Sequence, residues 1–295
     1  MIATTESINP LTADLDLLAT EDLVRAFADD QLNAVAAVQR AVPQIAQAVE
    51  RIAERLSTGG RLLYAGAGTS GRLAYLDSSE LTPTFGFPPE RVGVAMAGGR
   101  GAVFKAVEGA EDDFDLGWRD LQTLEVSEKD ALIGIAASGM TPYVLGALKA
   151  ARSAGALTIG FSNNAESLVL EHCDCPVLLD TGAEIISGST RLKAGTAQKI
   201  ALNTLSSAVM VRLHKVYGNL MVDVQATNLK LRKRAVRLTQ IASAASEAAA
   251  TAALEASDWH VKTAIVVLRN NLSVVEAKSL LAACDGSVRA ALLVR

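Results

Sequence analysis

The chain is 295 residues long, and its composition is 50% hydrophobic, 4% aromatic and 20% charged. This length corresponds to about two structural units. The hydrophobic residues are mostly small and aliphatic, a composition that excludes disordered and fibrous proteins and favours helices packed on a parallel sheet. The net charge of −4 excludes the broad basic field of a non-specific nucleic-acid binder and leaves small neutral or anionic ligands open.

Residues 1–52 are predicted to form an N-terminal helical segment. Apolar residues recur at intervals of three and four from Thr20 to Leu56, the period of amphipathic helices, with Pro43 as a candidate break. The opening residues have neither the basic start nor the apolar run of a secretion signal, and no stretch reaches the ~18 apolar residues of a membrane span. We therefore expect a cytoplasmic protein that contacts no membrane.

Residues 53–223 are predicted to form a parallel α/β domain. Five apolar runs, each followed by Gly, Ser, Thr or Asn and then by a helical pattern, indicate buried strands joined by crossover helices. The runs are Arg61–Ala65, Arg91–Ala97, Ala131–Ala137, Ala156–Phe161 and Cys175–Leu179, and the helical patterns include Pro142–Ala154 and Leu192–Tyr217. We expect a three-layer, doubly wound, five-stranded sheet with the flavodoxin-like strand order 2-1-3-4-5.

Residues 224–295 are predicted to form a small C-terminal helical domain. Three short helical patterns fit after Ser246, of which Val261–Leu268 and Ser273–Ala283 are the clearest. The basic run Lys230–Arg234 has no interleaved aromatic residues, so we interpret it as a solvated helix face and not as a nucleic-acid patch. Because the apolar core of this domain is marginal alone, we expect the domain to pack over an active site, that of a partner subunit.

Two loops carry hydroxyl groups where an open parallel sheet binds its ligands, beyond the carboxyl ends of the strands. They are Gly66–Gly71 and Ala137–Pro142, and they contribute Thr69, Ser70, Ser138 and Thr141. Hydroxyls and free N–H groups at two helix N-termini would bind a phosphate without a lysine. The alternative, that these side chains only cap their helices, stays open.

The first loop also matches the glycine spacing of a dinucleotide-binding fingerprint. That fingerprint expects an acidic residue at the end of the second strand. The segment Ala97–Arg100 has none, although Arg100 would suit a 2′-phosphate. An NADP-dependent enzyme is therefore a weaker alternative.

Metal chemistry is not expected. The run His172–Cys175 is the one cluster of ligand-type residues, and its last residue enters a predicted strand, so we interpret the run as packing. The sequence has no nucleophile elbow for a serine triad. Catalysis must then rest on hydroxyls and carboxylates. Glu80 and Glu111 are the candidate carboxylates, and solvated surface acids are the alternative for both.

Eight motifs occur in an order that resembles one known family. They are Thr5–Pro10, Gly66–Leu73, Glu80 in its Thr-Pro-Thr-Phe-Gly context, Ala97–Gly99, Glu108–Asp112, Ala137–Val144, Gly188–Thr196 and Lys215–Asp223. From about residue 5 to its end the chain resembles the N-acetylmuramic acid 6-phosphate etherases. The resemblance implies a sugar-isomerase (SIS) domain, a UBA-like C-terminal domain, a homodimer with its active site near the subunit interface, and no cofactor.

The resemblance also implies a reaction, cleavage of the D-lactyl ether of N-acetylmuramic acid 6-phosphate to N-acetylglucosamine 6-phosphate and D-lactate. It assigns Glu111 as the base at C2 and Glu80 as the acid toward lactate. Leu81 and Phe85 would raise the pKa of Glu80 by desolvation, as an acid near neutral pH requires. The implied phosphate-binding residues are Thr69, Ser70, Ser138, Thr141, Ser189 and Lys193.

The chain departs from the family pattern at Leu81, His214 and Ser162–Asn164, and none of these departures removes a carboxylate or a phosphate-loop hydroxyl. Two other functions stay open. A phosphosugar sensor without chemistry would use the same loops, and an aldose–ketose isomerase would use the same fold with one proton-transfer base.

Overall fold

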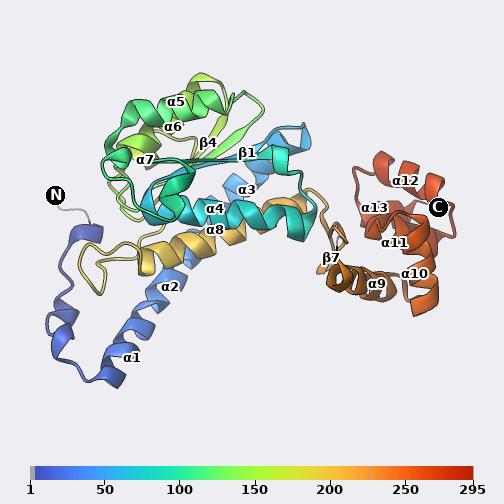
Figure 1. Cartoon of the computed structure of the whole chain (residues 1–295), viewed down its shortest axis with the longest axis horizontal. Coiled ribbons are helices and arrows are strands. Elements are labelled where there is room, and N and C mark those ends of the chain that lie inside the picture. Colours follow the sequence, from blue (N-terminus) through green and yellow to red (C-terminus); the bar gives the residue numbers. More distant parts are fainter. Residues whose placement is uncertain (1–3, 227, 295) are drawn as a thin grey trace. The chain divides into compact units, whose positions relative to one another are not determined.

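A computed structural model describes residues 4–226 and 228–294 of the chain (Figure 1). The chain divides into two compact units. The first comprises the residues up to Ser78 together with Glu90–Ser207, and the second comprises Ser79–Pro89 together with the residues from Ala208 onward. None of the helices in the two described ranges is long and apolar enough to cross a membrane.

The N-terminal part of the first unit is helical, as the periodicity predicts. Three short 3₁₀ turns, Thr4–Glu6, Pro10–Thr12 and Leu15–Leu17, precede α1 (Thr20–Asp30), α2 (Leu32–Arg40) and α3 (Val42–Ser57). Pro43 lies in the first turn of α3, where the N–H that proline lacks has no helical partner in any case. The proline therefore begins a helix instead of breaking one.

A five-stranded parallel sheet follows, with the order β2-β1-β3-β4-β5, so the predicted strand order is confirmed. The strands are β1 (Leu62–Gly66), β2 (Val92–Met96), β3 (Ala131–Ile135), β4 (Leu157–Ser162) and β5 (Cys175–Leu178). The connecting helices are α4 (Gly68–Phe85), α5 (Phe114–Thr123), α6 (Pro142–Ser153), α7 (Leu168–Glu171) and α8 (Lys193–Arg212), with 3₁₀ turns at Pro89–Arg91, Arg100–Val103 and Ala110–Asp112.

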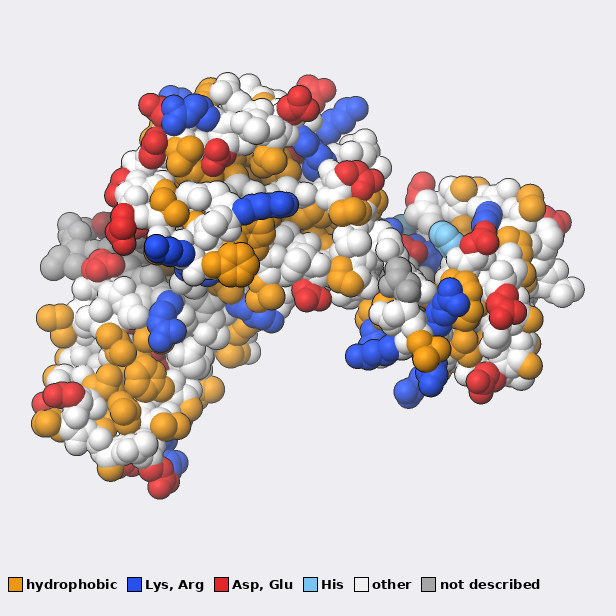
Figure 2. Space-filling model, in the orientation of Figure 1, with side chains coloured by type: hydrophobic (Ala, Val, Ile, Leu, Met, Phe, Trp, Pro, Cys, Tyr) orange, Lys and Arg blue, Asp and Glu red, His pale blue; other side chains and the backbone are white. Residues whose placement is uncertain are grey.

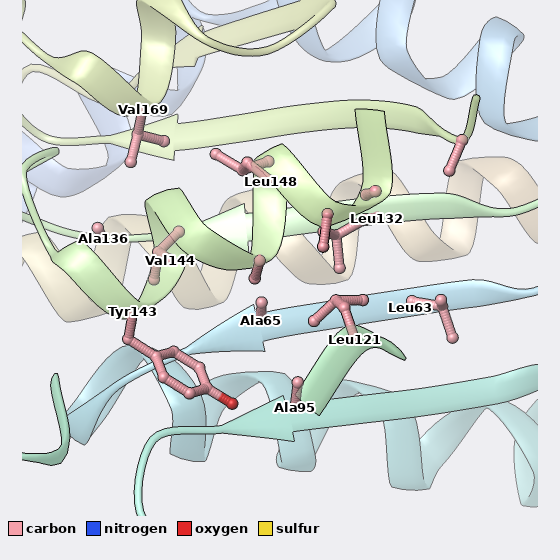
Figure 3. Packing of buried hydrophobic residues seen from close by; sticks show 14 of the residues in the cluster. Leu63, Ala65, Ala95, Leu121, Leu132, Ala136, Tyr143, Val144, Leu148 and Val169 are labelled. Carbon is pink, nitrogen blue, oxygen red and sulfur yellow. The ribbon is translucent and has the colours of Figure 1, made fainter. Parts of the chain in front are cut away.

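Helices cover both faces of the sheet. On one face α5 and α6 pack against strand residues such as Leu63, Ala65 and Leu132, and Figure 3 shows the labelled side chains of this core between sheet and helices. On the other face the Tyr64 hydroxyl of β1 donates a hydrogen bond of 2.9 Å to Asp77 of α4. Two polar side chains of α8, Asn203 and Ser206, donate to the same carboxylate at 2.8 Å and 3.0 Å. The expected three-layer arrangement is therefore present.

In its described residues, the second unit contains the C-terminal part of α4, the last residues of α8, a hairpin and five further helices. The hairpin strands and these five helices are β6 (Val216–Tyr217), β7 (Leu220–Met221), α9 (Leu229–Ser243), α10 (Glu247–Ala256), α11 (Val261–Asn270), α12 (Val274–Ala283) and α13 (Val288–Leu293). Buried Val222, Leu254, Ile265 and Ala277 belong to its own hydrophobic core. The described residues after Ser246 therefore form four helices, one more than the three predicted patterns.

The predicted helix Leu192–Tyr217 was wrong at its C-terminal end. α8 ends at Arg212 because His214 adopts a left-handed backbone with φ of 58°, and the Lys215 N–H bonds back to the Met210 carbonyl, which is a helix-ending pattern. The following residues pair as the antiparallel hairpin of β6 and β7.

Candidate active site

A pocket of about 430 Å³ opens at the carboxyl ends of β1 and β3. Five of the predicted site residues line it, namely Thr69, Ser70, Glu111, Ser138 and Thr141. Neither lysine nor arginine is among the described residues that line this pocket. An anion bound here would therefore be held by hydroxyl groups and backbone N–H groups.

The loop from β1 to α4 requires glycine at two places. A Cβ at Gly66 would lie 2.8 Å from the Gly71 nitrogen, and a Cβ at Gly71 would lie 2.9 Å from the Gly66 oxygen. This close backbone approach places Thr69 and Ser70 in the first turn of α4, where free N–H groups favour anions.

Ser70 is held in place by a buried hydrogen-bond chain. Ser70 is 7% exposed, and its hydroxyl donates to Gln198 Oε1 at 2.8 Å. The Gln198 amide donates in turn to Asn163 Oδ1 at 3.0 Å, and the Asn163 amide donates to the Leu179 carbonyl at 2.8 Å. These hydrogen bonds fix Ser70 against α8 and the ends of β4 and β5.

The loop from β3 to α6 places Ser138 and Thr141 beside each other, with their hydroxyl oxygens 3.5 Å apart. Ser138 Oγ also accepts a hydrogen bond of 3.2 Å from the Met140 N–H. Thr141 is the N-cap of α6, but its side chain makes no capping hydrogen bond. The hydroxyl of Thr141 is therefore not committed to the helix and can serve a ligand. Gly139 permits the turn, because its φ is 71° and a Cβ there would lie 2.1 Å from Ser167 Oγ.

Glu111 lies on the 3₁₀ turn Ala110–Asp112 and is exposed. It borders both the main pocket and a second pocket of about 230 Å³ that Arg72 and Met96 also line. Arg72 supports this side of the site, since its guanidinium donates to the carbonyls of Val103 at 2.9 Å and Ala102 at 3.0 Å. Glu111 is thus free to reach a ligand from the rim of the main pocket.

Glu80, Ser189 and Lys193 are not among the residues that line the main pocket. Glu80 is exposed on α4, whereas its neighbour Leu81 is only 2% exposed and turns inward. The apolar surroundings that we expected around Glu80 are therefore not provided by Leu81 within the single chain.

Lys193 is engaged in a buried ion pair. Its ammonium lies 2.7 Å from Asp30 Oδ1 and also donates to the Ala183 carbonyl. Nearby, the carboxylate of Glu184 accepts the N–H groups of Lys193 and Ala194 at the start of α8. Burial raises the pKa of Glu184, against the opposing effect of these hydrogen bonds. These contacts stabilise the loop before α8.

The run His172–Cys175 takes part in packing contacts. Cys175 Sγ accepts a hydrogen bond of 3.1 Å from Arg51, and Asp174 accepts the N–H and hydroxyl of Thr158. Among residues 4–226 and 228–294, no group of three or more His, Cys, Asp or Glu side chains is arranged to hold a metal ion.

Three pocket residues with polar side chains were not predicted as site residues: Glu6, Asp112 and Thr190. Asp112 and Thr190 adjoin predicted residues in the sequence. Glu6 belongs to the motif Thr5–Pro10, and this motif was the one sequence signal that pointed to it.

Comparison with known proteins gives consistent matches. Residues 44–152 match the family model of the glucokinase regulatory protein N-terminal SIS domain. The chain is 59% identical over 285 residues to an N-acetylmuramic acid 6-phosphate etherase of Deinococcus radiodurans, covering 97% of this chain and 93% of the relative. It is 49% identical over 288 residues to an etherase of Rubrobacter xylanophilus, covering 98% and 95%. A phosphoheptose isomerase from Francisella tularensis has a similar fold, with a TM-score of 0.51 at 19% identity, over 66% of this chain and 100% of that chain.

Proposed function

The chain belongs to the family of N-acetylmuramic acid 6-phosphate etherases, and on this premise we propose that its pocket cleaves the D-lactyl ether of N-acetylmuramic acid 6-phosphate. The products are N-acetylglucosamine 6-phosphate and D-lactate, and the protein is a carbon–oxygen lyase of cell-wall recycling. We place this activity in the cytoplasm. The observation that carries the proposal is one pocket that combines two hydroxyl-bearing helix N-termini with carboxylates, among them Glu111.

The chemistry needs two carboxyl groups in opposite protonation states. In the open-chain sugar the C2 proton lies α to the C1 aldehyde, so Glu111 can remove it as a base. Glu80 then donates a proton to the lactate oxygen as the C3–O bond breaks. Water adds at C3, with Glu80 now acting as the base, and the proton held by Glu111 returns to C2. Protons and electron pairs balance without an added cofactor.

The phosphate is assigned to Thr69, Ser70, Ser138 and Thr141. Their hydroxyls border the pocket together with the first turns of α4 and α6, whose N–H groups carry partial positive charge. The described lining residues include neither lysine nor arginine, so the phosphate donors are the hydroxyls of Thr69, Ser138 and Thr141 together with backbone N–H groups. Ser70 contributes its N–H, because its hydroxyl proton is donated to Gln198.

Glu80 is assigned to the active site of a second copy of the chain. It lies ten residues beyond Ser70 on α4, which is about 15 Å along a helix. Only three carbon–carbon bonds of about 1.5 Å separate the reacting C3 from C6, which carries the phosphate. A sugar phosphate held at Ser70 is therefore poorly placed for Glu80 of the same chain.

A homodimer is supported by the surface of the N-terminal helices. Not one residue of α1 is buried, although the helix is amphipathic. Val24 of α1 is 62% exposed and Leu32 of α2 is 68% exposed, and Figure 2 shows hydrophobic side chains gathered over these helices. An apolar helix face of this kind usually has a partner, and we infer that the partner is the second subunit.

The direct test is incubation with N-acetylmuramic acid 6-phosphate and an assay of free D-lactate. The etherase releases lactate, whereas a phosphosugar sensor binds without turnover and an aldose–ketose isomerase changes the sugar without releasing lactate. Absence of lactate release from folded protein would contradict the proposal.

The shared site is tested by a heterodimer of Glu80→Gln and Glu111→Gln subunits, co-expressed with different tags. If Glu80 acts on the partner's pocket, one of the two sites in this heterodimer keeps both glutamates and lactate release returns to about half of the parent value. A heterodimer as inactive as the two homodimers would show that both glutamates act within one chain.

A further inference from the structure

The N-terminal turn Thr4–Glu6 is tied to the pocket by Asn164, a residue 159 positions away. Thr5 is fully buried, and its N–H donates to Asn164 Oδ1 at 3.1 Å while the Asn164 amide donates to Thr5 Oγ1 at 2.9 Å. The same amide donates to the Ala137 carbonyl at 2.9 Å. One side chain therefore holds both the N-terminal turn and the loop that carries Ser138.

A second tether follows a few residues later. The Thr12 hydroxyl donates to the Ile185 carbonyl at 3.0 Å, and Asn9 caps the turn Pro10–Thr12 by accepting the Leu11 N–H at 3.1 Å. Residues 5–12 are thus attached at both ends to loops that follow β4 and β5. This attachment fixes Glu6 between the two tethers.

Glu6 borders the main pocket and faces the loop at Gly188. A Cβ added to Gly188 would lie 3.2 Å from Glu6 Oε2, so glycine leaves this carboxylate room. Glu111 and Asp112 are the other carboxylates of the pocket. The elimination uses only one of these three, which leaves Glu6 without a role in the proposed proton transfers.

A carboxylate can only accept hydrogen bonds, and the described lining residues offer it no lysine or arginine. A sugar phosphate brings further donors, because the hydroxyls between C3 and C6 lie between the phosphate and the reacting carbons. We propose that Glu6 accepts a hydrogen bond from one of these hydroxyls and so positions C2 of the substrate against Glu111. Thr5 and Asn164 are positioning residues that act through Glu6. This inference rests on the proposed function.

The test compares two ligands on parent protein and on Glu6→Ala, Glu6→Gln and Asp16→Ala variants. The ligands are N-acetylglucosamine 6-phosphate, which carries the hydroxyls, and inorganic phosphate, which lacks them. Glu6→Ala should weaken binding of the sugar phosphate about 10-fold to 100-fold, the loss expected for a hydrogen bond to a charged group. It should not weaken binding of inorganic phosphate, because it removes a negative charge from the pocket. Glu6→Gln keeps an acceptor oxygen, so its affinity for the sugar phosphate should fall less than that of Glu6→Ala. Asp16 is an exposed carboxylate of the following turn, Leu15–Leu17, and Asp16→Ala should bind both ligands like the parent.

Kinetics give the second readout. In Glu6→Ala, exchange of the C2 proton with D₂O and release of lactate should fall by the same factor, because a mispositioned sugar fails before the first bond changes. Thr5→Val alone should lower both rates by a smaller factor than Glu6→Ala. Added to Glu6→Ala, it should lower them no further, since Thr5 acts through Glu6.

Two results would overturn the inference: parent-like binding of the sugar phosphate by Glu6→Ala, or an equal loss for inorganic phosphate. A parent protein that releases no lactate contradicts the etherase proposal, yet the binding comparison still decides the role of Glu6.

Discussion

Proton removal at C2 needs only the base, whereas cleavage of the C3–O bond also needs the acid, so the two steps can be separated by mutation. Glu80→Gln should abolish lactate release yet still exchange the C2 proton with D₂O. Glu111→Gln should lose both reactions. Each affected rate should fall by a factor of about 10²–10⁴, the usual contribution of a general acid or base. NMR measures the exchange rate, and a lactate assay measures the cleavage rate.

The asymmetry between the two variants is the informative result. Lactate release near the parent level in Glu80→Gln would remove Glu80 from the acid role. Exchange that survives in Glu111→Gln but not in Glu80→Gln would reverse the assignment. In that case Glu108 and Asp112, which border the two pockets next to Glu111, become the next candidates for the base.

Ser70→Ala should weaken phosphosugar binding and also reduce stability. The substitution removes the donor to buried Gln198 Oε1, and an unsatisfied buried acceptor costs about 1–3 kcal/mol. Urea unfolding measures the stability, and titration with N-acetylglucosamine 6-phosphate measures the binding. Ser57→Ala is the matched control, because this exposed hydroxyl bonds only to the Glu54 carbonyl within α3. Comparable kcat/KM of the parent on the unphosphorylated sugar would contradict the phosphate assignment.

Residue by residue, the sequence was most informative where a side chain depends on its own loop. The hydroxyls of Ser138 and Thr141 could be placed because a strand end and a helix start are local features. Glu6 could not be placed, since its position depends on the contact between Thr5 and Asn164. The ion pair between Lys193 and Asp30 is hidden in the same way, because its partners are 163 positions apart.

The starts of β1 and β3 are locked together by Asp130 and Arg61. Asp130 is 1% exposed and accepts the Arg61 N–H at 2.9 Å and the Arg61 guanidinium at 2.7 Å. Arg61→Ala leaves the carboxylate buried without its counter-charge, and we expect a loss of about 3 kcal/mol in the free energy of unfolding. Arg25→Ala, which breaks an exposed pair with Glu21, should cost at most about 0.5 kcal/mol.

The same pair gives a pH dependence with a definite sign. Burial raises the pKa of Asp130, but the hydrogen bonds from Arg61 and Ser127 outweigh burial and hold the pKa below its ordinary value. The charged carboxylate therefore stabilises the fold above its unfolded pKa of about 4, and this contribution disappears as the pH falls through the lower folded pKa.

Asp130→Asn should accordingly be less stable than the parent at about pH 7, and the difference should shrink toward about pH 3. Urea unfolding at both pH values measures it. A difference that stays constant over this range would show that the charge of Asp130 contributes no stability.

Among the elements, the strands were predictable because both faces of the sheet are covered, which makes each strand a continuous apolar run. The end of α8 was not predictable from the sequence, because the apolar period continues past Arg212 while the backbone turns at His214. A left-handed histidine has no strong sequence signature, in contrast to the glycines of the β1–α4 loop. The hairpin of β6 and β7 was missed for the same reason.

At the scale of the whole molecule, the sheet order could be predicted because crossover helices and short connections leave few topologies. The occupant of the apolar face on α1 and α2 could not be predicted, since periodicity shows that a helix is amphipathic and not what covers it. The proposed second subunit would explain both this face and the exposure of Glu80.

Charged substitutions on the N-terminal helices test this arrangement. The parent should elute at about twice the chain mass of 30.8 kDa. The double variant Val24→Glu with Leu32→Glu should elute as a monomer, because two buried carboxylates without partners would oppose association. If Glu80 serves the partner's pocket, the monomer should also lose lactate release while keeping its thermal unfolding transition.

Val275→Glu is the matched control, since Val275 is 75% exposed on α12, and it should remain dimeric and active. A monomeric variant with full activity would mean that each chain carries a complete site, and Glu80 would then have to reach the pocket of its own chain.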